Sequence, residues 1–161
     1  MTTLYTIGYE GASLPDFIAT LHGAGVRHVL DVREVPQSRR PGFSKNVLAA
    51  ALEAEGISYS HMKALGDPKE GREAARRGDH DEFVQIFEAH LSTREAGEAL
   101  MAAAETVALK PTTLLCYERD PKTCHRTIVG ARIKDVCSFN VQHLGVRHHA
   151  SRQFGTVAEA A

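Results

Sequence analysis

The fold is decided by residues 112–126, which read TTLLCYERDPKTCHR. Residues Thr112 to Cys116 form a β-branched and apolar run of strand length, bounded by a proline before it and a charged loop after it. Thr123 occupies a position typical of a helix N-cap, because apolar residues with helical spacing follow it. The stretch therefore predicts a buried strand, a short polar loop and a helix.

The same alternation of strand and helix extends over the rest of the chain. Further strands are expected at 4–8, 28–32, 57–61 and 139–144. Helices are expected at 14–22, 45–55, 83–91, 96–108 and 124–136. Apolar strands separated by helices predict an α/β fold in three layers, an open, mostly parallel sheet of about five strands with helices on both faces.

Two segments do not fit this alternation. Residues 62–78 are polar and contain several glycines, so they predict a long mobile loop with one helical turn around 70–77, which could cover the sheet edge as a lid or be a plain surface excursion. Residues 146–161 are polar and predict a C-terminal tail, which leaves 1–145 as a single α/β domain.

The composition restricts the class of protein. The 161 residues carry a formal net charge of −1, so overall charge gives no case for nucleic-acid or membrane binding. No apolar run approaches the roughly 20 residues of a membrane span, and the first residues do not form a signal peptide, so we expect a cytoplasmic protein. Three irregularly spaced cysteines predict reduced thiols rather than a disulfide framework.

Basic residues gather where ligands bind in open parallel sheets, at the carboxyl ends of the strands. Arg33 and Arg39 follow the second strand, and Arg126 begins the helix after the fourth. If these strands are neighbours, the guanidinium groups converge on one anion. The alternative is that Asp31 or Glu34 pairs with the arginines and simply holds the loop. The expected ligand-binding residues are Gly8, Tyr9, Arg33, Ser38, Arg39, His125 and Arg126.

Candidate catalytic groups flank the fourth strand. Cys124 is the better nucleophile, because a thiol at a helix N-terminus beside basic residues has its thiolate favoured, whereas Cys116 reads as a small buried hydrophobe. Glu118 could act as acid or base. Both cysteines with His125 and His143 could also form a zinc site, but the seven residues between the cysteines exceed the usual chelating loop, so no metal is expected.

The chain resembles the family known as domain of unknown function 488. The matching pieces run in order over about 120 residues: Thr6 to Tyr9, Asp31 to Arg33, Pro36, Ser38 and Arg39, Phe43, Leu65 and Gly66, Leu115 to Glu118, and Cys124 to Arg126. The resemblance implies a cytosolic α/β domain of bacteria and archaea whose activity is unsettled. Its matching positions coincide with the strand-end residues found above.

A weaker resemblance is to rhodanese. The strand and acidic-basic turn at 29–34, and Cys116 followed by a loop and a helix, look like that family's layout. The departures are Pro121, which has no N–H, and the acidic Glu118 and Asp120, which repel the anion that a rhodanese loop holds.

Three hypotheses follow for the function. The first is binding of, or action on, a phosphate-bearing ligand such as a nucleotide or nucleic-acid end. The second is rhodanese-like or redox thiol chemistry at Cys116 or Cys124, and the third is a non-enzymatic DNA-binding or protein-binding module. The pattern names no substrate, cofactor or oligomeric state, and it leaves open whether the chain is an enzyme and whether its histidine-rich end binds metal.

Overall fold

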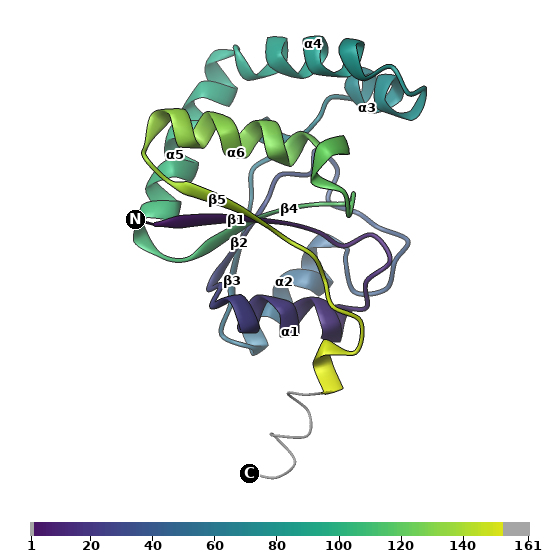
Figure 1. Cartoon of the computed structure of the whole chain (residues 1–161), viewed down its shortest axis with the longest axis vertical. Helices are drawn as coiled ribbons and strands as arrows, with labels where there is room; N and C mark the ends of the chain where they lie inside the picture. Colours follow the sequence, from purple (N-terminus) through teal and green to yellow (C-terminus); the bar gives the residue numbers. More distant parts are fainter. Residues whose placement is uncertain (1, 153–161) are drawn as a thin grey trace.

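Five parallel strands form one sheet in residues 2–152, the part of the chain that the computed structural model describes (Figure 1). The order in the sheet is β3-β2-β4-β1-β5. The strands are β1 (Thr3–Gly8), β2 (His28–Asp31), β3 (Ser58–His61), β4 (Thr112–Cys116) and β5 (Asn140–Leu144). Parallel pairing places Gly8 beside Cys116 and Asp31 beside Leu115, so β1, β4 and β2 end together at one edge. The predicted fold class is confirmed.

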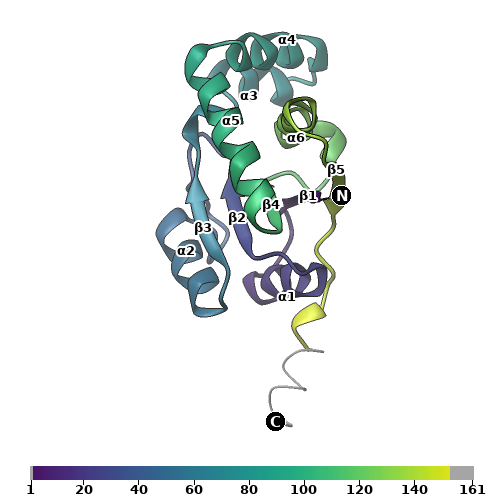
Figure 2. The same ribbon diagram turned by 90° about the vertical axis from the view of Figure 1, so that its left-hand side faces the viewer.

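Helices cover both faces of the sheet, as Figures 1 and 2 show. One face carries α1 (Leu14–Ala24) and α2 (Lys45–Ala54), and the other carries α5 (Arg94–Leu109) and α6 (His125–Val136), with α3 (Lys69–Arg76) and α4 (His80–Leu91) beyond them. No helix within residues 2–152 has the length and apolarity to cross a bilayer.

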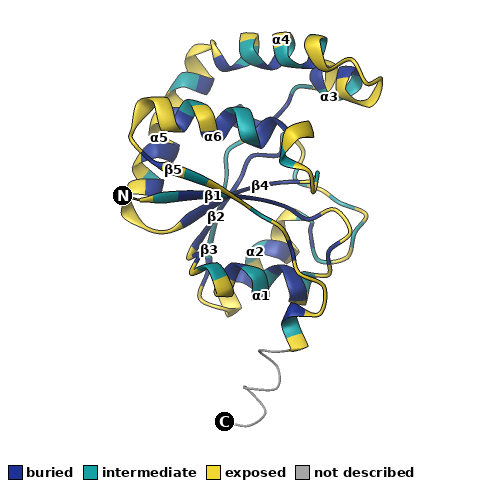
Figure 3. Cartoon of the chain, viewed as in Figure 1, coloured by how far each residue is buried: buried dark blue, intermediate teal, exposed yellow. Residues whose placement is uncertain are grey.

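Alternation along the strands divides the interior into two apolar cores. Leu30 and Leu114 pack in the core that α4, α5 and α6 cover, whereas Val29 and Leu115 pack in the core under α1 and α2. Every residue of β2 and β4 is buried, although β2 includes the polar His28 and Asp31 and β4 begins with two threonines. Figure 3 shows the buried central strands between helices whose outer faces are exposed, whereas the edge strand β5 is itself partly exposed.

Three local features differ from the sequence-based expectation. Residues 62–78 are not a long loop: they hold a short 3₁₀ turn, Lys63–Leu65, and the two-turn helix α3. The N-cap of α6 is Cys124 rather than Thr123, because residues 121–123 form their own 3₁₀ turn. The expected polar tail is bound to α1 as far as residue 152, since Val146 is buried and Asp16 accepts hydrogen bonds from the backbone N–H groups of residues 149 and 151. Residues 153–161 lie outside the described part.

A buried histidine joins β2 to its neighbour β3. The ring nitrogens of His28 lie 2.7 Å from Ser58 Oγ and 2.8 Å from Ser60 Oγ. Burial, with a further contribution from the charge of Lys110, lowers the pKa of His28 to about 4.

We therefore expect the fold to lose stability in mild acid. The unfolded chain takes up a proton near pH 6.5 that folded His28 resists until about pH 4, so this stabilisation is complete above pH 6.5 and declines below it. Between pH 7 and pH 5 the loss is about 2 kcal/mol. Urea unfolding at several pH values measures this loss. His28→Asn should flatten the dependence of the free energy of unfolding on pH between pH 7 and pH 5, and His22→Asn, at an exposed histidine, should leave that dependence unchanged. Equal pH profiles for wild type and His28→Asn would contradict the assignment.

Candidate functional site

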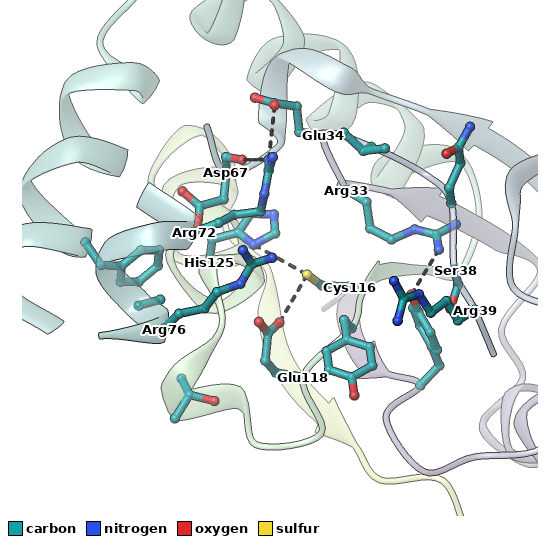
Figure 4. Close-up of a pocket in the computed structure, with 17 residues that line it drawn as sticks. Arg33, Glu34, Ser38, Arg39, Asp67, Arg72, Arg76, Cys116, Glu118 and His125 are labelled. Atoms are coloured by element: carbon teal, nitrogen blue, oxygen red, sulfur yellow. Dashed lines mark hydrogen bonds and ion pairs between the residues drawn. The ribbon is translucent and has the colours of Figure 1, made fainter. Parts of the chain in front are cut away.

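A pocket of about 660 Å³ opens at the carboxyl edge of the sheet (Figure 4). Its floor is formed by Tyr9 after β1, Arg33 after β2 and Cys116 at the end of β4, which the strand order brings together. Residues 34–39 line one side, and α3 with the segment before it lines the other. This volume lies within the range of small-molecule sites.

Arg33 is part of the floor but is not a free cation. Its Nε donates to Asp31 Oδ1 at 2.9 Å and its Nη2 to Oδ2 at 2.7 Å, while Nη1 donates to Tyr9 Oη and to the backbone oxygen of Phe43. Burial alone would lower the pKa of Arg33, but the bonds and charge of Asp31 raise it above its ordinary value. The alternative in which Asp31 pairs with the arginine is therefore what the structure shows. Arg33 holds the loop after β2 in place.

Arg126 does not converge with Arg33 on one point. Its side chain is fully buried, and Nε donates to Thr6 Oγ1 at 3.2 Å. The two terminal nitrogens donate to the backbone oxygens of Glu118, at 2.5 Å, and of Arg119, at 3.2 Å. The expected pair of arginines around one anion is thus absent, because the start of α6 turns this side chain under the loop after β4.

Other arginines face the pocket. Arg72 donates to Glu34 Oε1 at 3.0 Å and to the backbone oxygen of Asp67. Arg39 and Arg76 are exposed, and their side chains form no hydrogen bond or ion pair with any other residue in 2–152. Figure 4 shows these two side chains on opposite sides of Cys116. The cationic groups available to a ligand are therefore Arg39 and Arg76.

Two thiols, an imidazole and a carboxyl group meet at the pocket floor. Nδ1 of His125 lies 3.4 Å from Cys116 Sγ and 3.8 Å from Cys124 Sγ. Nε2 of His125 lies 2.7 Å from the backbone oxygen of Val32, which can only accept, so Nε2 carries a proton and Nδ1 faces the thiols. Cys116 Sγ also donates to Glu118 Oε2 at 3.4 Å. Cys116, Glu118 and His125 line the pocket, while Cys124 lies behind them.

This proximity shifts the pKa of each group. Burial raises the pKa of the Cys116 thiol well above its usual value, and it raises the pKa of Glu118 to about 7. For Cys124, hydrogen bonds to Cys116 and His125 outweigh burial, and its pKa lies well below the ordinary range. The Cys124 thiolate in turn outweighs the burial of His125 and raises its pKa to about 9. The expectation of a favoured thiolate at Cys124 agrees with this shift, although the thiol is not exposed to the pocket.

Asp67, which the sequence did not single out, lies in the pocket wall before α3. It is buried, and its Oδ1 is the one buried side-chain oxygen or nitrogen in residues 2–152 that lacks a hydrogen-bond partner. Burial, opposed by the charges of His125 and Arg72, raises its pKa to about 6. A buried oxygen without a partner is unusual, and it is available to a donor on a ligand.

The remaining predicted site residues have structural contacts. A Cβ at Gly8 would lie 1.8 Å from the backbone oxygen of Glu118, so a side chain there would displace the loop after β4. The Tyr9 ring stacks on Phe43 with 4.5 Å between centroids. Ser38 lies in the pocket wall, where its Oγ accepts from the N–H of Arg40. Gly8 is therefore a close-packing position, whereas Tyr9 and Ser38 lie at the pocket itself.

The sequence missed Asp67, Arg72 and Arg76 because their segment read as loop. Tyr117 lies in the stretch Leu115 to Glu118 that the sequence places at the strand ends, but the sequence gives it no role; its exposed ring stands edge-on to Tyr9 at the pocket. A signal for α3 existed in its charge spacing, since Lys69 and Glu73 stand four residues apart and lie within 3.9 Å.

Comparison with known proteins gives one match. The family described as "Domain of unknown function DUF488" matches residues 13–133, a range that contains β2 to β4, most of α6 and the whole Cys116, Glu118, Cys124 and His125 group. No curated protein and no solved structure matches the chain. The family model covers most of the 161 residues and agrees with the resemblance noted in the sequence, so the chain belongs to the DUF488 family.

Proposed function

We propose that the pocket binds and acts on a phosphate-bearing ligand, a nucleotide or a nucleic-acid end. The observation that carries the proposal is the pair of exposed arginines, Arg39 and Arg76, on opposite sides of a floor that contains Cys116, Glu118 and His125. Arginines without counter-ions in the described chain are suited to binding phosphate oxygens through two parallel hydrogen bonds.

The acidic residues of the pocket oppose an anion less than their number suggests. Glu118, whose pKa is raised to about 7, carries only about half of its negative charge near neutral pH, whereas Asp67, whose pKa is raised to about 6, is mostly ionised there. Glu34 is paired with Arg72. Of these three acids, only Asp67 therefore opposes an anion with a nearly full, unpaired charge.

An apolar side of the pocket supports the nucleotide class over inorganic phosphate. Tyr117 is 47% exposed and Val35 is 52% exposed, and both line the pocket. An exposed tyrosine ring offers a face on which a base can stack, worth about 1–3 kcal/mol per base. The pocket thus combines a cationic region with an aromatic one.

Thiol transfer is supported less well. The thiol that lines the pocket is Cys116, whose pKa is raised, and the thiol whose pKa is lowered, Cys124, does not line it. A nucleophile needs both the thiolate and access to the substrate. Cys116 is still within 3.4 Å of His125 Nδ1, so a rhodanese assay with Cys116→Ser is the direct measurement for this second candidate.

Thermal shift against nucleotides tests the proposal. We expect a nucleoside mono- or diphosphate at a hundred times its Kd to raise the Tm by about 5 °C or more, and the phosphate-free nucleoside to raise it less. Arg39→Ala and Arg76→Ala should each weaken binding about tenfold, the usual effect of losing one charged hydrogen bond. The matched control is Arg77→Ala, since Arg77 is adjacent in sequence but pairs with Glu82 outside the pocket.

Two results would end the proposal: no Tm increase with any phosphate-bearing ligand, or unchanged affinity in both Arg39→Ala and Arg76→Ala. Binding of long DNA with a steep salt dependence, and none of mononucleotides, would instead favour the non-enzymatic module.

A further inference from the structure

Three side chains at the pocket floor have the arrangement of a metal site. The ligand atoms of Cys116, Cys124 and His125 lie within 4.8 Å of one another, and all three residues are buried. In a tetrahedral zinc site, bond lengths of about 2.3 Å to sulfur and 2.0–2.1 Å to nitrogen place sulfur and nitrogen about 3.6 Å apart. The two distances from His125 Nδ1, 3.4 Å and 3.8 Å, lie on either side of that value.

The imidazole is oriented as a metal ligand requires. Nε2 of His125 donates to the backbone oxygen of Val32 at 2.7 Å, so Nδ1 faces the two sulfurs and is the nitrogen that gives up its proton when a metal ion binds. A hydrogen bond from the second ring nitrogen to a carbonyl group is the usual support of a metal-bound histidine. The main chain after β2 thus fixes the tautomer that can bind a cation.

The charges around the cluster also fit a divalent ion. Arg126 is fully buried beside Cys124 and forms no ion pair within the described chain; its hydrogen-bond partners are a hydroxyl group and two backbone oxygens. Two thiolates neutralise a divalent cation, and the carboxylate of Glu118, 3.4 Å from Cys116 Sγ, then balances Arg126. With the ion bound, the net charge of the cluster is close to zero, which lowers the cost of burying these charged groups.

We propose that Cys116, Cys124 and His125 bind one Zn²⁺ ion whose fourth coordination position opens into the pocket beside Glu118. Soft thiolate ligands with imidazole select zinc over magnesium or calcium. Three protein ligands with one open position are typical of catalytic rather than structural zinc. The spacing of seven residues, which argued against zinc in the sequence, loses its force because the 3₁₀ turn at 121–123 folds the loop back and brings Cys124 to Cys116.

The proposal goes beyond the proposed function and does not depend on the identity of the ligand. An ion at this place lies between Arg39 and Arg76, where it can polarise a phosphate oxygen or activate a water molecule. Glu118 lies beside the open position and can accept a proton from that water.

Metal analysis of the full chain, expressed without a polyhistidine tag, tests the site. We expect on the order of one zinc per chain after dialysis against zinc and removal of the excess. Replacement of zinc by Co²⁺ should give a thiolate-to-cobalt charge-transfer band and the intense visible bands of tetrahedral cobalt. Cys116→Ser, Cys124→Ser and His125→Ala should each weaken zinc binding at least tenfold in competition with a chromophoric chelator. Cys137→Ser is the matched control, because that cysteine is exposed at the end of α6.

Zinc uptake no greater than that of a Cys116→Ser/Cys124→Ser double variant overturns the proposal. So does uptake that both single variants retain, which would place the metal elsewhere. The cobalt spectrum of the unmodified chain keeps the test valid if the variants misfold: without a charge-transfer band, no thiolate binds the metal.

One further measurement separates this inference from the proposed function. Nucleotide binding by metal-free protein, measured by thermal shift, depends on Arg39 and Arg76 and not on zinc. Zinc bound without nucleotide binding leaves the metal site intact and removes the phosphate proposal, and the reverse result removes only the metal site.

Discussion

Asp31→Ala is expected to lower the free energy of unfolding by about 3–5 kcal/mol, the cost of leaving one member of a buried ion pair without its partner. Asp31 is fully buried and Arg33 is 5% exposed, and two hydrogen bonds join their side chains. Tyr59 adds a third donor to the same carboxylate, at 2.5 Å. With the carboxylate removed, the guanidinium group stays in an apolar setting with only Tyr9 and a backbone oxygen as acceptors.

Urea unfolding followed by circular dichroism measures this loss, which is large against a typical total of about 5–15 kcal/mol. Asp135→Ala, at an exposed position in the last turn of α6, is the control and should change stability by less than about 0.5 kcal/mol. The double replacement Asp31→Leu with Arg33→Met should recover part of the loss, because it removes the buried charge together with its partner. A single Asp31→Ala variant as stable as Asp135→Ala would contradict the assigned role of the pair.

Arg126→Met is expected to cost about 3 kcal/mol and to release the loop between β4 and α6. Methionine fills a similar volume but donates no hydrogen bond, so the backbone oxygens of Glu118 and Arg119 lose their donor at about 1–3 kcal/mol each. Removal of a buried charge offsets part of this cost. Hydrogen exchange should become faster at the amides of residues 117–123, and unfolding in urea should occur at lower concentration.

Arg132→Met is the matched control, because it makes the same replacement on the same helix. Arg132 pairs with Glu88 at a partly exposed site, so its loss should cost less than about 1 kcal/mol. If the two variants have equal stability and equal exchange at residues 117–123, Arg126 does not hold the loop.

The sequence predicts most of the fold because short β-branched and apolar runs, such as residues 112–116, alternate with segments of helical spacing. It predicts the place of the pocket for a related reason: parallel strands send every following loop to one edge, whatever the loops contain. The sequence indicates only one turn of the helix α3, because its eight residues, KEGREAAR, offer only alanines as apolar side chains. A helix that buries little surface gives a weak periodic signal.

The roles of the arginines could not be predicted from the sequence. Arg33, Arg39 and Arg126 look alike in a loop or at a helix start, yet the first is paired with an acid, the second is exposed and the third lies under a loop. The role of Arg126, for example, depends on where the backbone oxygens of residues 118 and 119 lie in the folded chain. The sequence around Arg126 does not indicate their position. The grouping of Cys116 with Cys124 has the same origin, because it depends on how the loop between them closes.

One wall of the pocket is formed by α3, and this wall can change in evolution independently of the sheet. Cys116 ends β4 and Arg33 follows β2, at strand ends that the rest of the sheet requires, but Arg72 and Arg76 stand on a short helix between β3 and α4. Lengthening, shortening or recharging that helix therefore reshapes the entrance without altering the sheet. Swapping residues 67–77 between homologous chains should change the ligand preference of the pocket while its floor stays the same.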